Sequence, residues 1–173
     1  KKTLEMSTGM FAFALFDKPK NKIYLVRDRF GEKPLYWGFA GEGSAKSIIF
    51  SSEISALKEF PTFNPQLNIK SLDSLMKFQN IPSDLTIYKS IQKLKPANIL
   101  EIDLSKKIGE KRPKIYKWWS YEKLISSSIK NQLVERRQIL EELEKILTNS
   151  IRAQAVADVP IGCFLSGGID SSL

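Results

Sequence analysis

The chain has 173 residues, 42% of them hydrophobic and 27% charged, which is typical of a folded globular protein of about one domain. The net charge is +8, histidine is absent and cysteine occurs once, which excludes Ser-His-Asp or Cys-His catalysis, histidine-ligated metals and intrachain disulfides. The longest apolar run, residues 10–16, is too short to span a membrane, and no signal peptide is visible. Because the chain opens at Lys1 rather than Met, we expect a piece of a longer protein.

The first fifty residues predict two β-hairpins. Residues 10–16 alternate large and small apolar side chains, and turn-forming residues separate them from an apolar run at 22–27. Two short runs at 34–37 and 47–50, separated by glycines, predict the second hairpin. We expect the four strands to form one antiparallel meander, with the large residues of the first strand facing a core.

Helical patterns follow the hairpins. Residues 53–58 predict one or two helical turns that end before Pro61. One face of a second helix is marked by apolar residues at helical spacing, namely Ile69, Leu72, Leu75 and Met76. Residues 97–104 alternate again and predict a strand that closes the first domain.

The basic excess of the chain is concentrated in one segment, because residues 105–118 alone carry a net charge of +5 beside the helix breakers Gly109 and Pro113. We predict that residues 105–132 are a solvated basic connector. Its aromatic residues are expected to pack it onto a neighbour: Tyr116, Trp118, Trp119 and Tyr121. The alternative is a nucleic-acid-binding module in which these aromatic rings stack on bases.

The longest helix signal runs from about residue 134 to 157. Its apolar stripe predicts a core face and comprises Leu140, Leu143, Leu147 and Ile151, widened by Ile139 and Ile146. Pro160 ends the helix, and residues 161–165 predict a short buried strand. Cys163 lies in this strand, so we expect a structural thiol rather than a nucleophile.

A glycine- and serine-rich loop follows that strand, with the sequence Ser-Gly-Gly-Ile-Asp-Ser-Ser at 166–172. Gly167 and Gly168 let successive backbone N–H groups converge on one anion, and the serines add hydroxyl donors. The loop lacks the lysine of a Walker A motif. Asp170 cannot attract a phosphate itself, but it can ligate Mg²⁺ that bridges to phosphate oxygens. The loop therefore predicts a site for pyrophosphate with Mg²⁺.

This loop resembles the pyrophosphatase loop of the ATP-pyrophosphatase (N-type) synthetases. More narrowly, residues 158–172 are similar to the entry of the synthetase domain in glutamine-hydrolysing asparagine synthetases of class B. Three upstream blocks, at 9–15, 27–36 and 52–57, are similar to the later part of that family's class II glutamine amidotransferase domain.

The resemblance implies a fold and a domain order. Residues 1–104 would be the later part of an α+β Ntn-type glutaminase domain with four αββα layers, and 105–132 the connector. Residues 133–173 would begin an α/β synthetase domain of the adenine-nucleotide α-hydrolase-like class. The glutaminase nucleophile of this family is an N-terminal cysteine, which is not in these residues, so no catalytic residue is assigned within the chain.

The resemblance also implies a reaction. ATP would activate the β-carboxylate of aspartate as β-aspartyl-AMP, and ammonia from glutamine would displace AMP. Carried over residue by residue, the loop would bind pyrophosphate through Ser166, Gly167, Gly168, Ser171 and Ser172. The backbone of Leu165 would touch the nucleotide, and Asp170 would bind Mg²⁺. The residues that select the acceptor carboxylate would lie beyond Leu173, so a related amide- or lactam-forming enzyme acting on another carboxylate remains the alternative.

Arg27, Asp28 and Arg29 predict a turn organised by ion pairs and by the geometry of Gly31 and Pro34, with a lining role at the glutamine site or a domain interface as the alternative. The partners implied are glutamine, aspartate and ATP, without nucleic acid or membrane. A cytoplasmic location is expected, and a homodimer is left open.

Overall fold

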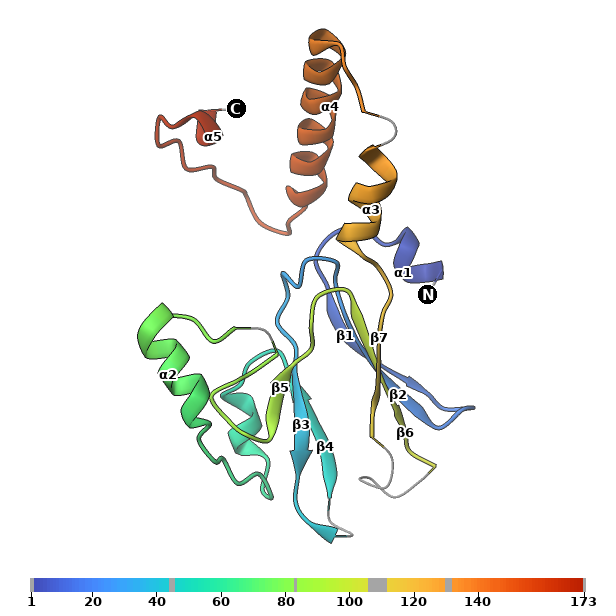
Figure 1. The fold of residues 1–173 in the computed structure, drawn as a ribbon, viewed down its shortest axis with the longest axis vertical. Helices are drawn as coiled ribbons and strands as arrows, with labels where there is room; N and C mark the ends of the chain where they lie inside the picture. Colours follow the sequence, from blue (N-terminus) through green and yellow to red (C-terminus); the bar gives the residue numbers. More distant parts are fainter. Residues whose placement is uncertain (1, 44–45, 83, 106–111, 130–131, 173) are drawn as a thin grey trace. The chain divides into compact units, whose positions relative to one another are not determined.

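A computed structural model describes residues 2–43, 46–82, 84–105, 112–129 and 132–172 (Figure 1). The chain divides into two compact units, Lys1–Leu124 and Ile125–Leu173. None of the helices within the described ranges combines the length and the apolar character needed to cross a bilayer.

The first unit contains two antiparallel sheets. One sheet has the strand order β1 (Ala12–Asp17), β2 (Lys22–Arg27), β6 (Asn98–Asp103) and β7 (Lys114–Lys117). The second sheet places β3 (Tyr36–Ala40) between β4 (Ser47–Ser51) and β5 (Ile91–Lys93). Both predicted hairpins are confirmed, as β1–β2 and β3–β4.

The single meander predicted from the sequence is wrong, because the two hairpins belong to different sheets (Figure 1). The partner of β2 on its second edge is β6, which lies about seventy residues further along the chain. Local periodicity reports strands and tight turns, whereas pairing across such a separation depends on the whole core. Local periodicity therefore predicts the two hairpins but not the strands that pair with them.

The core lies between the sheets. Its buried side chains come from both sheets and from the segments beside them: Leu25, Leu35, Trp37, Leu94, Leu100 and Ile102. A second buried cluster lies on the outer face of the β4-β3-β5 sheet. It joins one residue from each of these strands to Leu57 of the 3-10 helix η2 (Ala56–Glu59) and to two loop residues: Ala40, Ile49, Ile91, Phe63 and Tyr88.

The prediction that the large residues of the first strand face a core is confirmed only at Phe11, just before β1, which packs against the cluster of Val26 and Trp118. Ala12, on the small-residue face of β1, packs against the core between the sheets. Phe13 and Leu15 lie on the other face, where they are 40% and 54% exposed. Both faces of this strand are apolar, so a period of two cannot tell which of them is buried.

The helices of the first unit flank the sheets. The helix α1 (Lys2–Met6) precedes β1, and α2 (Ile69–Phe78) confirms the predicted second helix. The predicted turns at 53–58 form as η2, shifted by one to three residues.

Two elements form within the segment predicted as a connector. β7 pairs with β6, and α3 (Tyr121–Ser128) follows it. Trp118, between them, is 4% exposed and packs against Leu4, Val26, Ala97 and Ile99. The expected packing of the aromatic residues onto a neighbour is thus confirmed at Trp118, and the neighbour is the first sheet.

The second unit contains α4 (Arg136–Gln154) and α5 (Ile169–Ser172). The helix is confirmed, but its stripe is not buried, with Leu140 54% and Ile151 58% exposed. The predicted strand at 161–165 does not form, and Cys163 is exposed rather than buried. A buried strand needs neighbouring strands to satisfy its backbone, and the described part of this unit supplies none.

Candidate functional site

The predicted phosphate loop closes on itself through its hydroxyl groups. The Oγ atoms of Ser166 and Ser171 lie 2.8 Å apart. The carbonyl oxygen of Gly168 accepts hydrogen bonds from the hydroxyls of Ser171 and Ser172, at 3.1 and 2.8 Å. The structure therefore brings three predicted site residues around Gly168, at the start of α5.

The two glycines of the loop differ in conformation. Gly167 has a φ of +76°, in the left-handed region that residues with a Cβ rarely adopt. A Cβ built on Gly167 would have no neighbour within 4 Å, so only the backbone conformation favours glycine there. A Cβ on Gly168 would make ordinary contacts with the hydroxyls of Ser166 and Ser171, at 3.5 and 3.8 Å.

The remaining predicted residues stand apart from this hydroxyl cluster. Leu165 is 76% exposed, in the segment that leads into the loop. Asp170 is exposed in the first turn of α5, and its carboxylate forms no hydrogen bond or ion pair with another described residue. Within the described ranges, no three His, Cys, Asp or Glu side chains gather as a metal site. The single exposed carboxylate of Asp170 fits Mg²⁺, because this ion commonly takes one or two carboxylates and completes its shell with phosphate oxygens and water.

The turn after β2 is organised by the carboxylate of Asp28, which is 1% exposed. It accepts hydrogen bonds from the backbone N–H groups of Phe11, Phe30, Glu32 and Lys33, at 3.0 to 3.3 Å. Burial raises the pKa of Asp28, but these N–H donors lower it more strongly, so that its net pKa is lowered.

Arg27 and Arg29 bind backbone carbonyls on either side of this turn. The guanidinium of Arg27 donates to the carbonyls of Gly31, Lys33 and Leu94, and its burial lowers its pKa. Arg29 donates to carbonyls of α1 and of Ser7 after it, and its guanidinium lies 5.1 Å from the ring centre of Trp118. The predicted ion pairs are wrong, since neither arginine nor Asp28 pairs with another described charge within 4.0 Å.

The turn therefore has a structural role in these residues. The arginines donate hydrogen bonds to backbone carbonyls around the turn, and carbonyls carry no signature in the sequence. The carboxylate is satisfied by N–H groups in the same way. The Gly31 contribution to the predicted geometry is confirmed, because its φ is +70° and a Cβ there would lie 2.8 Å from Cγ of Pro96.

Comparison with known proteins assigns both parts of the chain. Residues 1–119 match the glutamine amidotransferase domain family, and residues 142–173 match the asparagine synthase family. The second match contains the whole loop described above.

Individual relatives agree with these two matches. The chain is 34% identical over 166 residues to the putative asparagine synthetase [glutamine-hydrolyzing] 2 of Methanocaldococcus jannaschii, a match that covers 95% of this chain and 30% of that protein. It is 33% identical over 169 residues to the asparagine synthetase [glutamine-hydrolyzing] 2 of Bacillus subtilis, covering 95% of this chain and 22% of that protein. The chain thus spans less than a third of the length of these curated relatives.

The first family match covers well over half of the chain, and the sandwich of antiparallel sheets lies within it. The chain belongs to the glutamine amidotransferase domain family, and a segment of the asparagine synthase family follows that domain.

Proposed function

We propose that the full-length protein makes asparagine from aspartate, using ATP to activate the β-carboxylate and glutamine as the source of ammonia. The observation that carries the proposal is the hydroxyl cluster around Gly168, in a loop that follows a glutamine amidotransferase domain in one chain. The names of the relatives support aspartate as the acceptor.

In this proposal the loop binds the pyrophosphate part of ATP. The hydroxyls of Ser166, Ser171 and Ser172 donate to phosphate oxygens, in exchange for the contacts that they now make within the loop. Gly167 and Gly168 leave the backbone N–H groups accessible to the anion, and the backbone of Leu165 contacts the nucleotide. Hydroxyl and N–H donors that point at the phosphate oxygens stabilise the negative charge of the leaving pyrophosphate as it forms.

Asp170 is the proposed ligand of Mg²⁺. Its exposed carboxylate makes no contact with a described positive group, which leaves its oxygens available. When bound, the metal would neutralise the charge that accumulates on the phosphate oxygens. Asp170 would hold it beside the hydroxyls, which act on the same oxygens.

We also propose the four-layer αββα arrangement of Ntn-type glutaminases for the first domain. Two sheets pack face to face around one core, and η2 covers the outer face of one of them. The outer face of the other sheet carries exposed Phe13 and Leu15, an apolar surface that a helical layer would cover.

The domain boundaries proposed are 1–104, 105–132 and 133–173, with one refinement. β7 and Trp118 join the first sheet, which supports a glutaminase domain that extends to about residue 119. The helix α4 then belongs to the synthetase domain, of the adenine-nucleotide α-hydrolase-like class.

The test compares two glycines in the full-length protein. Gly167→Ala places a Cβ on a left-handed residue of the loop, so asparagine formation should fall about tenfold or more with either glutamine or ammonia. Glutamate release from glutamine should stay within about twofold, since that reaction belongs to the other domain. Gly162→Ala is the control, because a Cβ there also meets open space and its backbone is ordinary. Unchanged synthesis in Gly167→Ala would contradict the assignment of the loop.

A further inference from the structure

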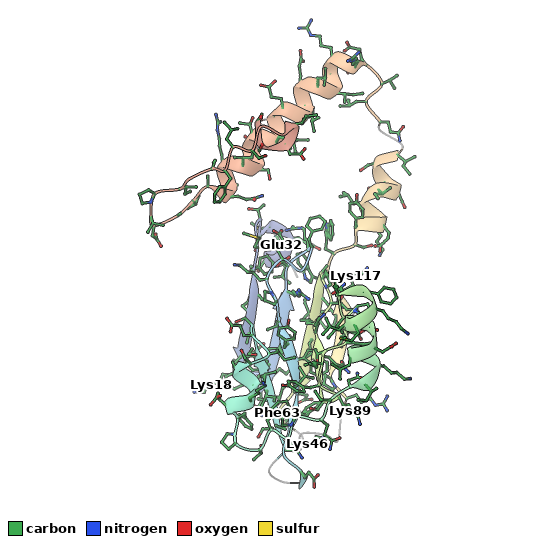
Figure 2. The ribbon with its side chains drawn as sticks, turned by 90° about the vertical axis from the view of Figure 1, so that its left-hand side faces the viewer. Lys18, Glu32, Lys46, Phe63, Lys89 and Lys117 are labelled. Atoms are coloured by element: carbon green, nitrogen blue, oxygen red, sulfur yellow. The ribbon has the colours of Figure 1, made fainter. Side chains whose placement is uncertain are left out.

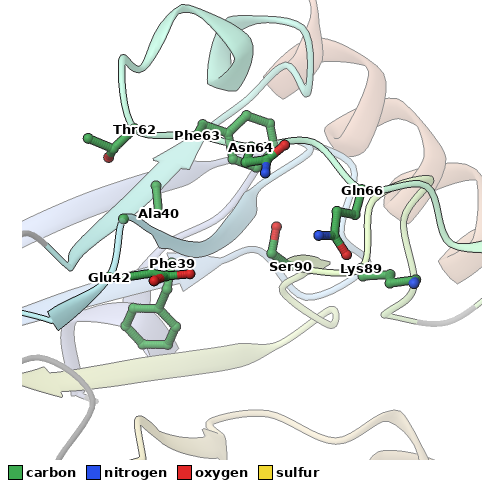
Figure 3. Close-up of a pocket in the computed structure, with 10 residues that line it drawn as sticks. Phe39, Ala40, Glu42, Thr62, Phe63, Asn64, Gln66, Lys89 and Ser90 are labelled. Atoms are coloured by element: carbon green, nitrogen blue, oxygen red, sulfur yellow. The ribbon is translucent and has the colours of Figure 1, made fainter.

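A polar pocket of about 270 Å³ lies in the first unit, away from the turn of Asp28. Its walls come from residues 39–42 at the end of β3, residues 62–66 after η2, and residues 89–90 before β5 (Figure 3). Phe63 and Lys89 lie toward one end of the unit, whereas Glu32 and Lys117 lie toward the other (Figure 2). Because the walls come from three distant segments, no sequence motif indicates this pocket.

Backbone contacts hold the three segments together. The N–H of Gly41 donates to the carbonyl of Thr62 at 3.1 Å, and the N–H of Lys89 donates to the carbonyl of Gln66 at 2.9 Å. The ring of Phe63 is buried edge-on against Tyr88, with ring centres 5.7 Å apart. The framework is thus fixed independently of the polar side chains that line the pocket.

The polar side chains that line the pocket are available for a ligand. None of them forms a side-chain hydrogen bond or ion pair with another described residue, and all are exposed: Glu42, Thr62, Asn64, Gln66, Lys89 and Ser90. Figure 3 shows the side chains of Gln66 and Ser90 directed toward a common space below Asn64. Glu42 lies on one side of that space and Lys89 on the other, with the ammonium group extending outward.

The chemistry of this set selects a type of ligand. Two carboxamides and a hydroxyl both donate and accept hydrogen bonds, so they suit an uncharged polar group. One carboxylate and one ammonium give the pocket no net charge, so a simple anion or a simple cation would match only one of them. A ligand that carries both charges would match both.

We propose that this pocket binds a small zwitterionic amino acid with an uncharged polar side chain, such as asparagine or glutamine. Its ammonium would pair with Glu42, its carboxylate with Lys89 at the rim, and its side chain with Asn64, Gln66 and Ser90. The volume of about 270 Å³ lies just below the range of about 300–1,000 Å³ for ligand pockets, which limits the pocket to one small molecule. This binding does not depend on the reaction proposed for the phosphate loop.

The first test is calorimetric titration of the 173-residue chain with L-asparagine and with L-glutamine. Saturable binding is expected, and both Asn64→Ala and Gln66→Ala should weaken it at least tenfold. These side chains are exposed, so circular dichroism should show an unchanged fold. Gln138→Ala, on the exposed surface of α4, is the matched control and should leave the affinity unchanged.

The second test examines the two charges separately. N-acetyl-L-glutamine lacks the ammonium and should bind the chain at least tenfold more weakly than L-glutamine. In Glu42→Gln that preference should disappear, because the carboxylate that recognises the ammonium is gone. L-glutaminamide lacks the carboxylate and should also bind the chain at least tenfold more weakly than L-glutamine. In Lys89→Met this difference should disappear, because the ammonium group that recognises the carboxylate is gone.

Three results would overturn the proposal. One is the absence of saturable binding up to about 10 mM amino acid, which would put any dissociation constant above that concentration. Another is binding that survives Asn64→Ala and Gln66→Ala unchanged. The third is tighter binding of D-glucose or inorganic phosphate than of either amino acid. None of these results bears on asparagine synthesis, which is measured separately.

Discussion

The carboxylate of Asp28 accepts four backbone N–H groups in a buried turn, so its replacement should be costly. Asp28→Asn keeps the shape but presents an NH₂ group to N–H donors and removes the charge that strengthens these bonds. We expect the free energy of unfolding to fall by about 2–4 kcal/mol, measured by chemical denaturation. Asp73→Asn, which removes an exposed ion pair with Lys77 on α2, should change it by less than about 0.5 kcal/mol. Equal effects of the two substitutions would contradict the role of Asp28.

Gly31 and Gly43 offer a matched comparison in the first unit. Both have a positive φ, of +70° and +54°, so alanine is strained at either position by about 1 kcal/mol. Only at Gly31 would the Cβ also crowd Pro96 and the guanidinium of Arg27, at 2.8 and 3.0 Å. Gly31→Ala should therefore destabilise the chain by about 1–3 kcal/mol more than Gly43→Ala in thermal unfolding. A similar loss in both variants would show that the crowding is relieved without cost.

At the level of elements, the start of α3 carries a carboxylate that responds to acid, Glu122. Hydrogen bonding from Ser120 and the charge of Lys117 lower the pKa of Glu122 from 4.5 to about 2. A lowered folded-state pKa means that the stabilisation is present above pH 4.5 and is lost as the pH falls toward 2. The melting temperature of Glu122→Gln should lie below that of the unchanged chain at pH 7, and the difference should close between pH 4.5 and 2. A difference that persists at pH 2 would assign the effect to packing instead.

Some of the helices and strands could be predicted from the sequence, and others could not. β2 and α2 begin and end within two residues of their patterns, because a turn bounds the apolar run of β2 and the apolar residues of α2 share one helical face. β5 and β7 were missed, since three or four residues carry too little pattern and their pairing is set by distant strands. The loop at 166–172 could be proposed as a site from the sequence, because a phosphate loop of the proposed kind requires fixed residue types at consecutive positions. The contacts of Arg27 and Arg29 were not, because backbone carbonyls are the same in every residue.

At the scale of the whole chain, Trp118 ties a segment predicted as a connector to the first sheet. Its indole N–H donates to the carbonyl of Arg27 at 3.0 Å, and its ring is buried against Leu4 and Val26. Trp118→Ala should lower the free energy of unfolding of the first unit by about 3–5 kcal/mol. Tyr121→Ala, at a ring that is 53% exposed, should cost much less in the same chemical denaturation experiment. A small effect of Trp118→Ala would return the segment to the role of a solvated connector.

The two units differ in how far their apolar side chains are buried. In the first unit most large apolar residues of the core are buried between and beside the sheets. In the second unit the stripe of α4 is exposed at Leu140 and Leu143, although its spacing is that of a core face. The exposed stripe accords with α4 as part of the proposed synthetase domain. The relatives of this chain are more than three times as long as it is.

The proposed binding of Mg²⁺-pyrophosphate by residues 166–172 is tested by aspartate-dependent ATP–pyrophosphate exchange in the full-length protein across a Mg²⁺ titration. Asp170→Asn keeps the shape of the side chain but loses the charge that holds the metal, so exchange should fall on the order of 10³-fold. Asp158→Asn, at an exposed carboxylate outside the loop, should leave exchange unchanged. If Asp170 has only a structural role in the first turn of α5, Asp170→Asn preserves the shape of its side chain, and exchange would stay within a few-fold of that of the unchanged protein. Near-normal exchange by Asp170→Asn at low Mg²⁺ would contradict the account.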